Sequence, residues 1–158
     1  MEKIGIPQEA VALNSVWIEA VEKALGECDD QALTNAVMKS AAKKCSIQIL
    51  DECRQILGKM PESVDDLLDA MNQRRLQKHN LARLWEKQGN KAHLILEECN
   101  CTLVRGGLVR PNPVHCLCSI GLMESLFSSV CRGPVHAELV KSIGSGDDVC
   151  EWNVTFEE

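Results

Sequence analysis

The sequence predicts an α+β fold, in which N-terminal helices pack on a small antiparallel sheet that carries one further helix. Two patterns lead to this prediction. Apolar residues recur every three to four positions through most of residues 1–88, and every second position in several segments after Asn90. The length of 158 residues suits one core. We therefore expect a single domain over 1–158, with a helical part at 1–88 and a cysteine-containing α+β part at 89–158.

The first helix is expected between Gln8 and Leu25. An apolar row recurs every four positions and consists of Leu13, Trp17, Val21 and Leu25. This row is expected to face the core, while charged residues such as Glu19 and Glu22 face water. Gly26 is expected to end the helix.

A second helix is expected to begin at an N-cap, Asp29 or Asp30, and to end near Lys44. A third is expected over residues 46–57, followed by Gly58 as its C-terminal residue.

Ser63, with Asp66 three residues later, resembles the N-terminal signal of a fourth helix. Polar residues 72–80 are expected to break its pattern. A short turn through residues 81–85 should then stop at the turn dipeptide Gly89-Asn90.

The later elements are expected to be strands with one helix between them. Alternating residues 92–96 predict a strand that runs into Cys99, and residues 103–113 are expected to be irregular. A helix is expected over 119–130, with Cys116 near its entrance. Residues 135–143 and 149–156 predict an antiparallel hairpin.

The cysteines suggest a site, because six of the nine lie in the last 60 residues. Four form two Cys-x-Cys pairs, Cys99 with Cys101 and Cys116 with Cys118. Two such pairs supply the four soft ligands that tetrahedral zinc, or alternatively an iron-sulfur cluster, requires. The sequence therefore predicts a metal site at these four residues, with zinc as the preferred metal.

Three other interpretations of the thiols remain open. One interpretation is that the pairs are reduced or reversibly oxidised thiols that act as a redox switch, and another is that they fill the core. A third possibility is a thiol enzyme in which Cys116 or Cys118 is the nucleophile and His136 or Glu138 carries the proton. Cys116 and Cys118 are the expected thiolates, because the unpaired N–H groups and the dipole at a helix start lower the pKa of a nearby thiol.

Composition argues against several classes of partner. The net charge is −6, and the one notable positive cluster, Arg74, Arg75 and Lys78, is better explained as a solvated helix face than as a phosphate site, so we expect no nucleic acid. No apolar run approaches a membrane span or a secretory segment, so we expect no membrane association and a cytoplasmic location. Thiols would then stay reduced.

The last strand resembles a known group of proteins. Residues 146–154, from Gly146 through Cys150 and Trp152, resemble the Gly-Asp-x-x-Cys-x-Phe-x-Ile ending of the 4-vinyl-reductase (hydrocarbon-binding) superfamily and of the related L-2-amino-thiazoline-4-carboxylate hydrolase family. Residues 134–143 resemble the strand that carries their glutamate, here Glu138, although Ser142 stands where many members have a further cysteine.

The resemblance implies a helix-flanked sheet that encloses a pocket for a small, mostly apolar molecule, often in a dimeric sensor or accessory module. We therefore expect a non-catalytic ligand-binding or sensor domain that forms a homodimer and whose cysteine metal site fixes the pocket wall. The expected ligand-binding residues are His136, Glu138, Cys150 and Trp152.

Overall fold

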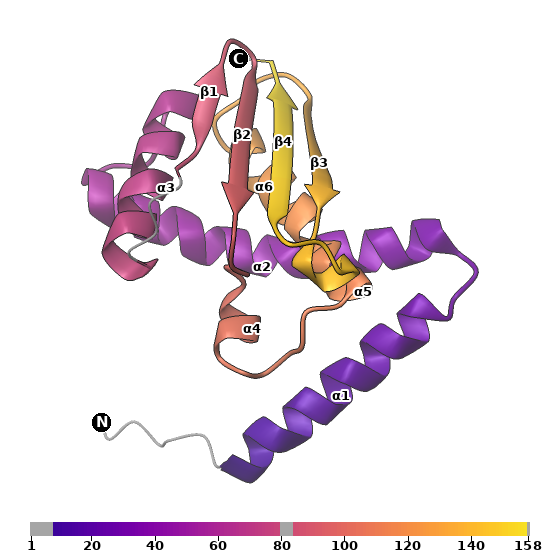
Figure 1. Cartoon of the computed structure of the whole chain (residues 1–158). Coiled ribbons are helices and arrows are strands. Elements are labelled where there is room, and N and C mark those ends of the chain that lie inside the picture. Colours follow the sequence, from indigo (N-terminus) through magenta and orange to yellow (C-terminus); the bar gives the residue numbers. More distant parts are fainter. Residues whose placement is uncertain (1–7, 80–83, 158) are drawn as a thin grey trace.

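The chain folds as helices packed against one face of a four-stranded antiparallel sheet, which confirms the predicted α+β class (Figure 1). The structure is a computed structural model and describes residues 8–79 and 84–157. The sheet has the strand order β1-β2-β4-β3. The elements are α1 (Gln8–Gly26), α2 (Gln31–Leu57), α3 (Val64–His79), β1 (Glu86–Gln88), β2 (Lys91–Leu96), α4 (Thr102–Arg105), α5 (Pro113–Cys116), α6 (Cys118–Ser128), β3 (Val135–Lys141), the 3-10 turn η1 (Ile143–Ser145) and β4 (Cys150–Phe156).

Helix α2 is continuous where the sequence predicted two helices. Its start and end are as expected: Asp30 Oδ1 accepts from the backbone N–H of Leu33 at 3.0 Å, and Gly58 ends the helix with a φ of 73°. The predicted break near residue 45 is wrong. Ser46 does not cap a new helix, because its hydroxyl donates to the carbonyl of Lys43 in the preceding turn.

Helix α3 begins as predicted, since the N–H of Asp66 donates to Ser63 Oγ at 3.1 Å. The expected break at residue 72 is wrong, because the helix continues to His79. Its polar second half is stabilised by side-chain pairs: Gln73 bonds Asp69 one turn earlier, and Arg74 pairs with Glu52 of α2.

Most of the turn predicted over residues 81–85 lies outside the described residues. The turn at Gly89-Asn90 is present, and it joins β2 to β1, a short strand that the sequence analysis missed.

The sheet turns one face to the helices, as the period of two predicts. Along β4 the buried residues alternate, so Cys150, Trp152, Val154 and Phe156 share the inner face. Leu94 and Leu96 of β2 lie opposite Trp152 and Cys150 in the register. The predicted hairpin of β3 and β4 is also confirmed. This inner face forms one wall of the core.

Helix α6 lies between α2 and the sheet (Figure 1). Its Phe127 is fully buried, with its ring centroid 5.6 Å from those of Trp85 and Phe156. On the side facing α2, Gly121 allows a very close approach. A Cβ atom at this position would lie 2.6 Å from Cα of Lys39. The two helices are also joined by the ion pair of Lys39 with Glu124, whose Nζ–Oε2 distance is 2.9 Å.

Helix α1 diverges from the rest of the molecule (Figure 1), and the face that it turns inward is rotated from the predicted one, with which it shares Leu25. Leu13 and Trp17 of the expected core row are 70% and 67% exposed, whereas Glu22, expected in water, is only 6% exposed. The inner row of α1, buried or half-buried, is instead Val11, Ser15, Ile18, Glu22 and Leu25. Two neighbouring faces of α1 carry apolar residues. The sequence prediction took the more apolar face as the buried one, whereas α1 packs on α5 through the less apolar face.

None of the helices in the described ranges is long and apolar enough to cross a membrane.

Candidate functional site

A cavity of about 250 Å³ lies between the helices and the inner face of the sheet. Its floor and sides are mostly apolar, with Leu94 and Leu96 from β2, Leu126 from α6 and Trp152 from β4. The other lining residues are Ala42, Cys45, Gln48, Ile49, Met71, Arg74, Arg75, Trp85, Cys99, Asn100, Cys101, Thr102, Leu103, His115, Cys116, Cys118, Ser119, Leu122, Met123, Leu139, Ser142 and Cys150. Segments from both halves of the chain therefore enclose a single space.

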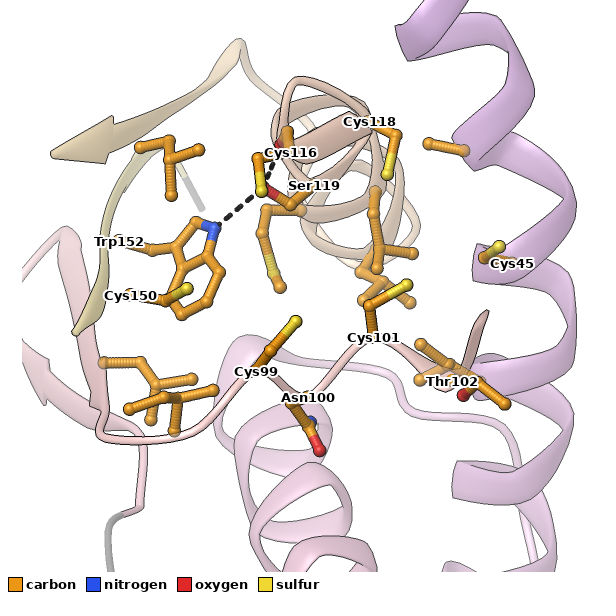
Figure 2. Close-up of a pocket in the computed structure, with 18 of the residues that line it drawn as sticks. Cys45, Cys99, Asn100, Cys101, Thr102, Cys116, Cys118, Ser119, Cys150 and Trp152 are labelled. Atoms are coloured by element: carbon orange, nitrogen blue, oxygen red, sulfur yellow. Dashed lines mark hydrogen bonds between the residues drawn. The ribbon is translucent and has the colours of Figure 1, made fainter. Parts of the chain in front are cut away.

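Six cysteines line this cavity, as Figure 2 shows: Cys45, Cys99, Cys101, Cys116, Cys118 and Cys150. Cys99 and Cys101 come from the segment between β2 and α4, and Cys116 and Cys118 come from the junction of α5 and α6. The two Cys-x-Cys pairs that the sequence analysis singled out thus border the same space. No disulfide joins any of the nine cysteines, all of which lie within the described residues.

The described residues contain no group of three or more His, Cys, Asp or Glu side chains arranged to hold a metal ion. Zinc or an iron-sulfur cluster at Cys99, Cys101, Cys116 and Cys118 therefore stays a prediction. Elemental analysis of protein purified without added metal tests it, with one zinc per chain as the expected value under that hypothesis.

Cys101 has a partner that the sequence analysis did not predict. Its Sγ lies 3.3 Å from Nε2 of His115, whose Nδ1 lies 2.6 Å from Oε1 of Glu22. Asn112 contacts both residues: its Nδ2 donates to Oε2 of Glu22 at 2.6 Å, and its Oδ1 accepts from the backbone N–H of His115. A thiol, an imidazole and a carboxylate thus form a continuous line from the cavity wall to α1.

Burial and hydrogen bonding set the charges of this line. The hydrogen bond with Cys101 is the main cause that raises the pKa of His115 to about 9, against the opposing effect of burial, and Glu22 adds to the rise. Burial acts to raise the pKa of Cys101, but the hydrogen bond with His115 and backbone N–H groups of the next turn outweigh it, so this pKa is lowered. The pair therefore favours thiolate and imidazolium.

Other cavity thiols are shifted in the opposite direction. Burial raises the pKa of Cys45, Cys99 and Cys150, and it raises the pKa of Cys118 to about 12. The expectation that Cys118 is a thiolate is therefore wrong, because loss of water around its sulfur outweighs any help from the start of α6.

Ser119 and Gly144 shape the wall beside Cys116. The hydroxyl of Ser119 accepts from Nε1 of Trp152 at 3.0 Å, which fixes the indole against the cavity (Figure 2). A Cβ atom on Gly144 would clash with Sγ of Cys116 and lie 2.7 Å from the carbonyl oxygen of Asn112. Only glycine thus allows η1 to pack this closely on α5.

Of the four residues expected to bind ligand, the structure brings two to the cavity. Cys150 and Trp152 line it from β4. His136 and Glu138 alternate with the buried Ala137 of β3, are exposed and do not line the cavity. Nδ1 of His136 instead lies 4.0 Å from Oε1 of Glu124 on α6.

The cavity also has a polar section. Arg75, only 3% exposed, lines it together with Gln48 and Asn100. Oδ1 of Asn100 is buried and has no hydrogen-bond partner among the described residues. Such an acceptor favours a ligand that brings a donor.

Sequence reasoning missed Glu22 and His115 for a definite reason. His115 lies 14 residues after Cys101, so no local spacing in the sequence links the two side chains. A signal for Glu22 did exist, because it continues the row of Val11, Ser15, Ile18 and Leu25 on one face of α1.

Comparisons with known proteins were made by sequence and by structure. A family model described as "Family of unknown function (DUF6144)" matches residues 6–158. No curated protein matches the chain.

Two solved structures are similar in fold. A trafficking protein particle complex subunit 3 from Naegleria fowleri, covalently bound to palmitic acid, aligns over 94% of this chain and 95% of its own, with a TM-score of 0.59 and 15% identity. A vinyl-4-reductase family protein from Methanocaldococcus jannaschii aligns over 99% of this chain and 85% of its own, with a TM-score of 0.41 and 13% identity. The first likeness shows the fold, and the second is too weak to assign the chain to that group.

Proposed function

Because the chain belongs to DUF6144, a family of unknown function, we propose its function from the cavity: it is a binding or sensor domain for a small, mostly apolar molecule. The observation that carries this proposal is the cavity of about 250 Å³ inside the core. Apolar side chains that line such a space lack part of their packing contacts, which costs stability. A bound molecule would recover that free energy by filling the space.

The walls indicate the chemistry of the ligand. Leu94, Leu96 and Leu126 offer apolar contact, while Arg75 and Asn100 form a polar section. This combination favours an amphipathic molecule with a short apolar body and one polar or acidic end. About 250 Å³ equals the liquid volume of roughly eight waters, which favours a small ligand.

The structural neighbour gives separate support. The trafficking protein particle complex subunit 3 with which the chain shares its fold is covalently bound to palmitic acid. A fold of this kind is thus compatible with a bound fatty acyl chain, and we propose that the present cavity holds an apolar chain.

Octanoate is a suitable probe, because it has an apolar body and an acidic end. We expect calorimetry to show one site per chain for octanoate, and Ala42→Leu to weaken its binding at least roughly tenfold by filling the cavity that Ala42 lines. Ala32→Leu is the matched control, since Ala32 is exposed on the same helix and should leave binding unchanged. Absence of octanoate binding, or equal binding by Ala42→Leu, would contradict the proposal.

We also propose that the protein forms a homodimer through α1. Leu13, Val16 and Trp17 are each more than 60% exposed on this helix, and a two-fold axis would pair the same apolar row from two copies. Light scattering is expected to give the mass of two chains. The double variant Leu13→Glu and Trp17→Glu is expected to give the mass of one, whereas Glu9→Gln on the same helix should not change it.

A monomeric mass for the unmodified protein would reject the dimer without affecting the proposal for the cavity.

A further inference from the structure

The line of Cys101, His115 and Glu22 goes beyond what a binding domain requires. A cavity that only holds an apolar molecule needs no charged group in its wall, because burial of a charge costs free energy. Here a carboxylate that is 6% exposed supports an imidazole that is 5% exposed, and the imidazole meets a cavity-lining sulfur at 3.3 Å.

We propose that Cys101 is a nucleophile that accepts acyl groups from activated esters or thioesters bound in the cavity, with His115 as proton donor and Glu22 as positioning residue. The proposal deepens the proposed function, since it rests on the cavity as the binding site for the apolar part of the substrate. The arrangement resembles a nucleophile–base–carboxylate triad in geometry alone, and its three members come from α1, the segment before α4, and α5.

Geometry assigns the role of each group. In the imidazolium form of His115 both ring nitrogens donate, Nε2 toward Sγ of Cys101 and Nδ1 toward Oε1 of Glu22. Asn112 donates to the second oxygen of Glu22 and accepts from the backbone N–H of His115. Both the carboxylate and the start of α5 are thereby fixed, and the imidazole ring has little freedom to rotate.

The other cavity thiols lack this arrangement. Sγ of Cys101 lies 3.3 Å from Nε2 of His115, whereas among the described residues no histidine nitrogen lies within hydrogen-bond distance of Sγ of Cys118. Cys118 is therefore a matched control, since it lines the same cavity without the same partner.

The chemical step is balanced without any further reactant. The thiolate of Cys101 attacks the carbonyl carbon of the substrate, and a C–S bond to Sγ forms. The bond from that carbon to the leaving oxygen or sulfur breaks, and the electron pair leaves with that atom. The leaving group then takes the proton from Nε2 of His115, which becomes neutral. The products are an acylated Cys101 and a free alcohol or thiol.

The apolar wall suits the acyl chain in this reaction. Leu96 and Leu122 line the same space as Cys101, so a short to medium chain can lie across the cavity while its carbonyl carbon meets Sγ. Arg75 lines the cavity too, and its positive charge favours leaving groups that carry negative charge.

The experiment uses para-nitrophenyl octanoate with the full chain. We expect a burst of nitrophenolate release, and an intact mass that increases by one octanoyl group located on Cys101 by peptide mapping. Cys101→Ser should abolish both signals, whereas Cys118→Ser should retain them. Octanoate binding, measured by calorimetry on each variant, reports separately on the cavity.

The outcomes separate the two proposals. Acylation that persists in Cys101→Ser, or its absence from the unmodified protein while octanoate still binds, would overturn the nucleophile and leave the binding domain intact. Absence of both acylation and octanoate binding would overturn both.

The role of Glu22 needs a variant that keeps its shape. Glu22→Gln should slow acylation at least roughly tenfold and move the labelling of Cys101 by iodoacetamide to higher pH, because His115 then loses its carboxylate. Glu22→Gln protein that is folded, as shown by circular dichroism, yet acylates at the unmodified rate would reject the positioning role.

Discussion

Replacement of Glu22 by alanine is expected to lower the free energy of unfolding by about 3 kcal/mol. The carboxylate of Glu22 is buried and holds two side chains of the α5 region, Asn112 and His115, at 2.6 Å each. Its removal leaves a buried imidazolium without its carboxylate and an amide without its acceptor, and both must then regain water or distort. Urea denaturation followed by circular dichroism measures the change.

Glu19→Ala is the control for this variant, because Glu19 lies on the same helix and is exposed. It should change the free energy of unfolding by no more than about 0.5 kcal/mol. Equal effects of the two substitutions would mean that the buried carboxylate contributes no more than a surface charge.

The destabilisation should also depend on pH. Because the fold raises the pKa of His115 from 6.5 to about 9, the stability that comes from its charged form is fully present below pH 6.5 and is lost as pH rises through about 9. The difference between the unmodified protein and Glu22→Ala is therefore expected to shrink above pH 9. Urea denaturation at several pH values checks this, and a difference that grows with pH would contradict it.

The second large effect is expected at Gly121. A Cβ atom there would lie 2.6 Å from Cα and 2.8 Å from the carbonyl oxygen of Lys39, so α6 would have to move away from α2. Both obstructing atoms are backbone, which side-chain rotation cannot relieve. We expect Gly121→Ala to destabilise the protein by about 2 kcal/mol.

The sign of this effect is informative, because helix propensity alone would favour alanine over glycine by about 1 kcal/mol. Ser128→Ala, at an exposed position near the end of α6, gives the propensity effect without the close approach. Thermal denaturation of the two variants compares them. If the Gly121→Ala protein were as stable as the Ser128→Ala protein, α6 could move away from α2 without loss of folding free energy, which would contradict the prediction.

The strands and the helix termini could be predicted from the sequence because their signals are local. The alternation of Cys150, Trp152 and Val154 fixes which face of β4 is buried, and Asp30 and Gly58 mark the ends of α2 through contacts within a few residues. The Cys-x-Cys pairs were also recognised as a group that belongs to one site, and the structure places both on the cavity.

The inner face of α1 and the partners of Cys101 could not be predicted in the same way. Helix α1 has apolar residues on two sides, and periodicity alone does not say which side is buried. The buried side includes the charged Glu22, whose hydrogen-bond partners Asn112 and His115 are far away in the sequence. The separation of Glu22 from His115 is 93 residues, so this contact depends on where α5 packs, which no local pattern encodes.

The three tryptophans occupy two kinds of environment, which gives the molecule its own optical reporters. Trp17 projects from α1 with 67% of its surface exposed, whereas Trp85 and Trp152 are about 5% and 6% exposed and border the cavity. An aqueous quencher such as iodide should therefore quench the fluorescence of Trp17 first. Burial of Trp17 on self-association would reduce this quenching, which is measured at the long-wavelength edge of the emission spectrum. Ligand binding in the cavity would change the emission of the buried Trp85 and Trp152 at the short-wavelength edge. Self-association and ligand binding can therefore be followed in one emission spectrum.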